Sequence, residues 1–290
     1  MLGKLLKHEW KGTYRVGCLM LILMVAVTFL GWLSFQSPMW NSLANDTEYY
    51  STNIAESLLN IMSVFTLLLY IFMLLAAVIG IVVYLAVHFY KTMYTDEGYL
   101  THTLPVTVNK LLFSKIFISG VWMMIIILAV YASLFALVCF MIGAILPDGY
   151  SVWEFWRVFG IEFSDLAELL RAEFGFDFVG WLKNFIVPLI IGPFLSMITL
   201  FGAISLGQLF TKHRVLMAIV SYFGVSIVSG ILGSAVEGII TASHAYSNSV
   251  EVVGSYLNVT FFSSLILDIV IAAAMFFAAW YVNTKKLNLE

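Results

Sequence analysis

Long runs of apolar residues, separated by short polar segments, dominate the pattern of this chain. Six of these runs are long enough to cross a bilayer, whose hydrocarbon core of about 30 Å needs roughly 20 apolar residues in a helix. The six runs cover residues 16–35, 58–90, 116–146, 185–210, 216–241 and 261–283. Solid runs favour helices over the alternating segments of about ten residues that build membrane β-barrels. The pattern therefore predicts an all-α integral membrane protein with six transmembrane helices.

The composition agrees with this fold class. Hydrophobic residues make up 62% of the 290 residues and charged residues only 11%, whereas soluble domains carry about 25% charged residues. The two cysteines, Cys18 and Cys139, fall in opposite halves of the bilayer, so they cannot pair within the chain, and they have no metal-binding spacing. No internal repeat and no linker rich in proline or glycine divides the sequence, so we expect residues 1–290 to form a single transmembrane domain.

The basic residues predict that both termini lie in the cytoplasm, because cytoplasmic loops of membrane proteins are enriched in lysine and arginine. With the termini inside, the inner segments hold eleven of the 14 basic residues. The outer segments hold only Arg157, Arg171 and Lys183. A cleaved signal peptide is the rival interpretation of the first run, but that run is too long and no small-residue cleavage site follows it.

Residues 1–15 show an amphipathic pattern ahead of the first apolar run. Leu2, Leu5, Leu6 and Trp10 recur at helical spacing, and the lysines of this stretch fall on the opposite side. Such a pattern predicts an elbow helix lying in the inner membrane interface. The alternative is a positively charged flank that only sets the orientation of the chain.

The longest outer segment, residues 147–184, combines acidic and aromatic residues. We expect one or two helices resting on the outer interface, with Ser164 as the N-cap of a helix that has Asp165 in its first turn. One interpretation is an acidic vestibule that receives a cationic or amphipathic molecule, and the other is a cap over the helix bundle. The acids that would form the vestibule are Glu162, Asp165, Glu168 and Glu173.

The fifth run carries a small residue at every fourth position, and these residues are Ser226, Gly230, Ser234 and Gly238. Small residues let two helix backbones approach closely in lipid, so this ladder serves either packing within the chain or a symmetric dimer. Two acids, Glu237 and Asp268, lie inside the outer thirds of their runs. Acids inside a membrane usually face protein or water. They form either a proton-coupling pair or the polar lining of a cavity near the headgroups.

The inner loop between the second and third runs, residues 91–107, predicts a short helix just under the membrane. Thr95 is suited to cap this helix, and Asp96 and Glu97 in its first turn favour the helix dipole. Pro105 ends the helix, and Thr107 precedes the next one. The alternative is a solvated connection. A rigid, acidic segment continuous with two spans is what a membrane subunit needs to receive force from a soluble motor.

The sequence lacks the motifs of common catalytic sites. It has no Walker A motif, no His-Glu-x-x-His zinc site, no Gly-x-Ser-x-Gly elbow and no Cys-His nucleophile pattern. No basic and aromatic patch indicates nucleic-acid binding. We therefore expect that this chain is not an enzyme and that its energy comes from another chain or from an ion gradient.

Two stretches resemble a known family. The stretch FYKTMYTDEGYLTHTLPVTVNKLLFSKI, residues 89–116, resembles the corresponding loop of ABC-2 type ABC transporter permeases from Gram-positive bacteria. The opening MLGKLLKHEWK is also similar to theirs. The permeases most similar in layout are those of lantibiotic immunity and of exporters for amphipathic peptides such as phenol-soluble modulins. One departure is that the long amphipathic insert lies between the third and fourth runs here, and not between the fifth and sixth.

The resemblance implies a partner set. It implies that two permease chains pair in the bacterial cytoplasmic membrane, with the first and fifth spans meeting across the dimer. Two cytoplasmic ABC ATPases would bind beneath them and would carry the ATP and magnesium, so this chain would hold no cofactor. The docking residues implied for the elbow and the inner loop are Leu6, Trp10, Asp96, Glu97, Gly98, Tyr99, Leu100 and His102.

Three functional hypotheses follow. The first is the permease of an ATP-driven exporter for amphipathic or antimicrobial peptides. The second is an ion-coupled secondary transporter that uses Glu237 and Asp268. The third is a membrane sensor or scaffold that transports nothing.

Overall fold

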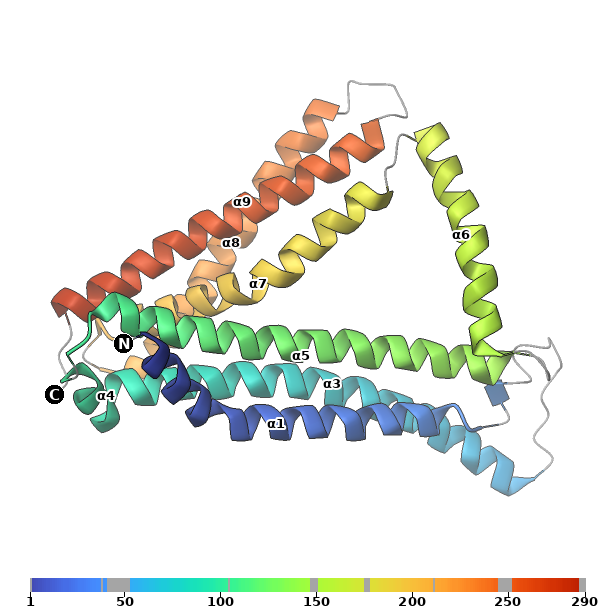
Figure 1. Cartoon of the computed structure of the whole chain (residues 1–290), viewed down its shortest axis with the longest axis horizontal. Coiled ribbons are helices and arrows are strands. Elements are labelled where there is room, and N and C mark those ends of the chain that lie inside the picture. The colour runs from blue at the N-terminus through green and yellow to red at the C-terminus, as the bar shows by residue number, and fades with distance from the viewer. Residues whose placement is uncertain are drawn as a thin grey trace. The chain divides into compact units, whose positions relative to one another are not determined.

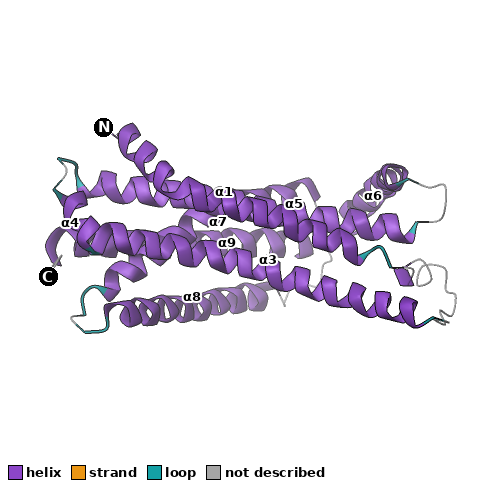
Figure 2. Cartoon of the chain, turned by 90° about the horizontal axis from the view of Figure 1, so that it is seen from below, coloured by secondary structure: helices purple, strands orange, loops and turns teal. Residues whose placement is uncertain are grey.

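The computed structural model describes residues 2–37, 39–40, 53–103, 105–146, 151–174, 178–210, 212–244 and 252–286. Helices connected by short loops make up this described part, and it contains no strand (Figures 1 and 2). The helices are α1 (Leu2–Ser34), α3 (Ile54–Tyr94), α4 (Asp96–His102), α5 (Val108–Ile145), α6 (Val152–Phe174), α7 (Phe178–Gly207), α8 (Arg214–His244) and α9 (Val252–Tyr281), followed by the π-helical turn η1 (Val282–Lys286).

Six helical segments of the described part are long and apolar enough to cross a membrane, which confirms the predicted spans. They are Leu2–Ser34, Ile54–Tyr94, Val108–Ile145, Leu182–Gly207, Arg214–Ser243 and Asn258–Lys286. The chain is therefore a multi-pass membrane protein of the all-α class. The amphipathic stretch at the N-terminus belongs to the uninterrupted helix α1, so a separate elbow helix is not shown.

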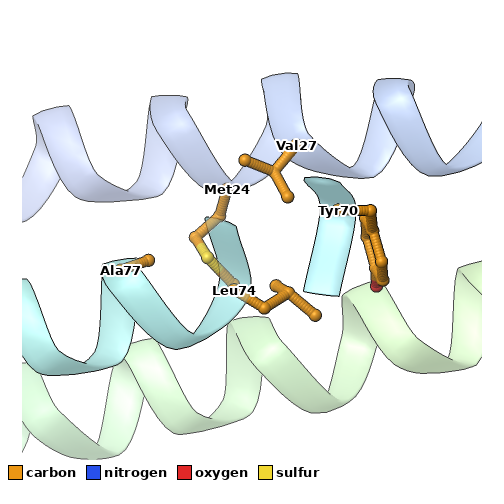
Figure 3. Close-up of a cluster of buried hydrophobic side chains, with 5 residues drawn as sticks. All are labelled: Met24, Val27, Tyr70, Leu74 and Ala77. Atoms are coloured by element: carbon orange, nitrogen blue, oxygen red, sulfur yellow. The ribbon is translucent and has the colours of Figure 1, made fainter. Parts of the chain in front are cut away.

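The chain groups into two compact units. Unit 1 consists of Met1–Gly12, Val83–Met124 and Asp165–Glu290, and unit 2 of Thr13–Val82 and Ile125–Ser164. In unit 2, α1 and α3 pack through a cluster of buried side chains (Figure 3). The cluster consists of Met24, Val27, Tyr70, Leu74 and Ala77. Beside it, the Ser133 hydroxyl lies 2.8 Å from that of Thr28 and 2.9 Å from that of Tyr70. Close packing and interhelical hydrogen bonds of this kind hold helices together in lipid, where hydrophobic force between them is absent.

In unit 1, α7, α8 and α9 pack against one another (Figure 1). A Cβ added to Gly202 of α7 would lie 2.8 Å from the carbonyl oxygen of Met275 in α9. Phe201, the neighbour of Gly202, stacks on Phe89 of α3 with 4.0 Å between the ring centroids. The absence of a side chain at Gly202 therefore lets two helix backbones approach closely.

The insert contains α6, but the predicted start of this helix was wrong. Ser164 lies in the middle of α6 and donates to the carbonyl oxygen of Ile161 at 2.7 Å. The helix begins thirteen residues earlier in a reciprocal cap: the Glu154 amide donates to the Ser151 hydroxyl at 3.1 Å, and the Ser151 amide donates to the Glu154 carboxylate at 3.1 Å. This is the capping box that Ser-x-x-Glu encodes, and it satisfies two backbone donors that the first turn leaves open.

Candidate functional site: helix α4 and its buried polar base

Helix α4 forms because the chain turns sharply after α3. Thr95 leaves the helical conformation, with φ −107° and ψ −167°, and its carbonyl accepts the first bond of α4 from the Gly98 amide at 2.7 Å. This confirms the short helix predicted after Thr95. The predicted side-chain cap is wrong, because the Thr95 hydroxyl donates back to the carbonyl of Lys91 at 2.6 Å. Helix α4 ends at His102, before Pro105, and α5 begins directly after Thr107, as the sequence predicts.

Gly98 fixes the position of α4 against the end of α3. It is buried, and a Cβ at this position would lie 2.5 Å from the carbonyl carbon of Met93 and closer still to its oxygen. No side chain fits there, so the sequence Asp96-Glu97-Gly98 requires its glycine. The tight turn leaves Asp96, Glu97 and Tyr99 on the surface, with Tyr99 63% exposed. The side chains of Leu100 and His102 lie outside the described part.

A network of charged and polar side chains lies in unit 1 on α1, α3 and α5. We call its four members, Glu9, His88, Thr92 and Lys115, the polar base. The Lys115 ammonium, 3% exposed, donates to the carboxylate of Glu9 at 2.7 Å and to the hydroxyl of Thr92 at 2.7 Å. Thr92 in turn donates to the His88 carbonyl at 2.8 Å. The second carboxylate oxygen of Glu9 lies 3.4 Å from Nε2 of His88. The polar base therefore joins α1, α3 and α5.

The polar base lies close to the start of α4 along the chain, because Thr92 precedes the turn residue Thr95 by three positions. Removing one charge from a buried ion pair is costly, because the remaining partner is left without compensation. The unit 1 ends of α1, α3 and α5 are therefore held together close to the point where α4 begins.

Two further contacts stiffen the same region of unit 1. Trp10, 39% exposed, stacks on Trp122 of α5 with 4.9 Å between ring centroids. At the end of α3, the Tyr94 hydroxyl donates to Ser205 of α7 at 2.7 Å and accepts from the side-chain amide of Asn283 in η1 at 2.9 Å. The turn into α4 is thereby tied to α7 and η1 as well. Of the remaining docking candidates, Leu6 is half-buried on α1.

The small residues of the α8 ladder are exposed in the described structure, and two of them, Ser226 and Gly230, line a cavity shared with α7 and α9. Ser226, Gly230, Ser234 and Gly238 are all exposed, and a Cβ added to Gly230 or Gly238 would meet no atom within 4 Å in the described structure. Of the two uses predicted for the ladder, packing within the described part of the chain is therefore not observed.

The predicted acids occupy separate places. Glu162, Asp165 and Glu168 are exposed on α6, and the side chain of Glu173 lies outside the described part. Glu237 is exposed on α8. Asp268 of α9 lines a cavity with α7 and α8. No hydrogen bond or ion pair between Glu237 and Asp268 is present in the described structure, so it does not bring them together as a pair.

Sequence reasoning missed the polar base. Its two charged members lie 106 residues apart, and although each belongs to one of the two stretches that carry the family resemblance, no local pattern indicates that they pair. A usable signal existed, because Glu9 is the only acid in the basic N-terminal stretch and Lys115 directly precedes the third apolar run. Among the described residues, no group of three His, Cys, Asp or Glu side chains is placed to hold a metal ion.

The fold and the site together define a polytopic helical membrane protein in which a short acidic helix follows α3, whose end takes part in a buried polar network. Comparisons with protein-family models, with curated proteins and with solved structures find no match to this chain.

Proposed function

We propose that this chain is the membrane-spanning subunit of an ATP-driven exporter in the bacterial cytoplasmic membrane. Helix α4 would receive a cytoplasmic ABC ATPase, and the ATPase would bind the ATP and magnesium. The observation that carries the proposal is the setting of α4: an exposed acidic first turn, a glycine that packs against the end of α3, and a buried ion pair that is hydrogen-bonded to Thr92 near that end.

The physical argument concerns the transmission of force. A docking helix on a flexible loop would absorb a push from a partner by bending. Helix α4 instead follows α3 after one residue and lies beside the polar base that joins α1, α3 and α5. Displacement of α4 would therefore move the ends of membrane helices. The chain has no nucleotide-binding motif of its own, so the force must come from another chain.

Co-purification tests the proposal. The tagged chain, taken from its native cells in mild detergent, is expected to bring down a protein with a Walker A motif. Reversing an exposed charge typically costs up to about 1 kcal/mol, so Glu97→Lys should reduce the recovered ATPase by roughly fivefold. Asp96→Lys, a charge reversal at a second exposed position in the first turn of α4, should give the same loss.

The matched control is Glu162→Lys, an equal charge reversal at an exposed position on α6. It should leave the recovery of the ATPase unchanged. Equal recovery with the parent chain and with both α4 variants would remove α4 as the docking element.

The second part of the proposal is a dimer of two permease chains that meet through the small residues of α8. Its support is the exposure of this ladder and the open space around Gly238, which does not line the cavity shared with α7 and α9. Gly230→Leu should lower the yield of dimer in disulfide cross-linking through cysteines placed in α8. Gly224→Leu is the control, because Gly224 also has open space but lies about a third of a turn around the helix. A parent protein that gives no cross-linked dimer would end this part of the proposal.

The third part concerns the exported molecule. Helix α6 exposes Glu162, Asp165 and Glu168 beside apolar side chains such as Trp153 and Ile161, a combination that suits cationic amphipathic peptides. Attraction between exposed charges is screened over about 8–10 Å near physiological salt, so the effect should weaken as salt rises. Replacing these three acids and Glu173 with glutamine should reduce protection of cells against a cationic peptide. A quadruple variant that is produced normally and protects like the parent would contradict this part.

A further inference from the structure

A cavity of about 390 Å³ lies within unit 1 among α7, α8 and α9, and we call it the α7–α9 groove. Its walls combine apolar side chains, including Leu195, Val225 and Ile271, with hydroxyl groups and one carboxylate. The residues that carry these polar groups are Ser196, Thr199, Tyr222, Ser226, Ser229 and Asp268. The volume falls within the range of about 300–1,000 Å³ that is usual for small-molecule sites.

Three of the five hydroxyl groups that line the groove are arranged as acceptors. Ser196 donates to the Pro193 carbonyl at 2.9 Å, Thr199 to the Leu195 carbonyl at 3.0 Å and Ser226 to the Tyr222 carbonyl at 2.8 Å. A hydroxyl has one donor and two lone pairs, so each of these oxygens has spent its proton on its own helix. These three hydroxyl oxygens can therefore accept hydrogen bonds from a ligand but have no free proton to donate to it.

Asp268 adds a carboxylate to this set. It lies ten residues into the span Asn258–Lys286, and within the described structure it makes no hydrogen bond or ion pair. A charged side chain at the centre of a membrane helix costs about 2.5–3.5 kcal/mol, which is why such residues are generally paired or face a polar cavity. The groove thus presents a carboxylate and several acceptors, and no basic side chain lines it.

We propose that the α7–α9 groove binds the primary ammonium group of an amphiphilic molecule, with Asp268 as its counter-ion and the hydroxyls of α7 and α8 as further acceptors. Three N–H donors of a primary ammonium match this excess of acceptors. The apolar walls match the hydrophobic body of an amphiphile. A bare ion needs a closed shell of close ligands and would leave most of this volume unfilled.

This inference deepens the proposed function, because it names the chemistry of the bound molecule and the residue that holds it. The role of this binding in export rests on the proposed function. Binding itself requires only this chain. The ammonium group could come from an exported peptide or from the headgroup of an aminophospholipid, and the lipid composition of the test distinguishes these two sources.

The test measures protection of a cysteine placed in the groove. Cys18 and Cys139 are replaced by alanine, Ser229 is replaced by cysteine, and the full chain is placed in phosphatidylcholine nanodiscs, which carry no primary amine. The rate of reaction with neutral methyl methanethiosulfonate is measured with dodecylammonium, dodecyltrimethylammonium or dodecanol, each at the same concentration in the bilayer. A charge-assisted contact of about 1.4 kcal/mol corresponds to a tenfold effect.

We expect dodecylammonium to slow the reaction about tenfold, the trimethylated cation to slow it less because it has no N–H donor, and dodecanol to have little effect. Asp268→Asn should abolish the difference between dodecylammonium and dodecanol. Glu237→Gln, which removes an exposed carboxylate outside the groove, should leave the difference intact. If the reaction is slower in phosphatidylethanolamine nanodiscs to which no amphiphile has been added, the lipid headgroup is the source of the ammonium.

Equal protection by all three amphiphiles, or full protection by dodecylammonium in Asp268→Asn, would overturn the inference. Asp268→Glu keeps the carboxylate and should retain protection. If Asp268→Asn loses protection while Asp268→Glu keeps it, the loss is due to the missing carboxylate charge and not to misfolding. The result is independent of the ATPase: Glu97→Lys should leave protection unchanged even where it removes the ATPase, so failure of the docking proposal and failure of this one are separable.

Discussion

At the scale of single residues, the free energy of unfolding is expected to depend strongly on the buried ion pair between Glu9 and Lys115. Glu9 is 8% exposed and Lys115 3% exposed, and their side chains meet at 2.7 Å. A buried ion pair contributes little net stability compared with apolar side chains of similar size, but breaking it leaves an uncompensated charge. The two residues are therefore expected to behave as one unit.

A double-mutant cycle tests this expectation. Lys115→Met removes the ammonium partner of the buried Glu9 carboxylate and should destabilise the protein by roughly 3–5 kcal/mol. Glu9→Gln should have a cost of the same kind, because it leaves the ammonium buried. The double variant should be far more stable than the sum of the two effects predicts. Unfolding in mild detergent measures the cycle, and Lys110→Met is the control, since Lys110 is exposed on the same helix. Additive effects would contradict the pairing.

The same residues show how far sequence reasoning reaches. The existence of α4 follows from Thr95, Asp96 and Glu97, because turn and first-turn preferences are local. The hydrogen bond of the Thr95 side chain could not be predicted from the sequence, because its hydroxyl can bond either to α4 or to the last turn of α3. In the structure it donates to the carbonyl of Lys91 in α3. The polar base could not be predicted by any local rule, since its partners meet only after the helices have packed.

At the scale of helices, the closeness of packing depends on where glycine lies. Gly202 of α7 faces the backbone of Met275, whereas Gly224 of α8 has no atom within 4 Å of an added Cβ. Both are interior helix positions, where alanine is intrinsically favoured over glycine by roughly 0.5–1 kcal/mol. The two glycines therefore provide a controlled comparison.

Gly202→Ala and Gly224→Ala should have opposite effects on stability. At Gly202 the added methyl group must push α7 and α9 apart, which should cost about 1–3 kcal/mol. At Gly224 the helix preference of alanine should leave stability equal or slightly higher. Thermal unfolding of the two purified variants in the same detergent checks the prediction. Equal unfolding temperatures would show that α7 and α9 do not approach as closely as the structure has them.

Helix α6 shows why element boundaries are harder to predict than elements. Ser164 followed by Asp165 looks like a helix start, yet the periodic pattern continues through it, and the real cap is Ser151 with Glu154. Two cap-like sequences within one apolar periodicity cannot be ranked by local preference alone. The six spans were predictable because a run of twenty apolar residues has few alternatives in a bilayer.

At the scale of the whole molecule, the described part of the chain combines six candidate membrane spans with a buried polar network in unit 1, the polar base. Its sequence contains no nucleotide-binding motif. The central claim is that this region transmits work from a soluble ATPase to the membrane helices.

Site-specific photo-crosslinking at Tyr99 tests this claim most directly. Tyr99 is 63% exposed on α4, and Trp153 is 77% exposed on α6, so a benzophenone amino acid at either position is accessible to partners. Irradiation of native cells should join position 99 to a protein with a Walker A motif, and position 153 should not form this adduct. If position 99 forms only lipid adducts or none, and the variant remains folded and active, α4 is not the element that contacts the ATPase.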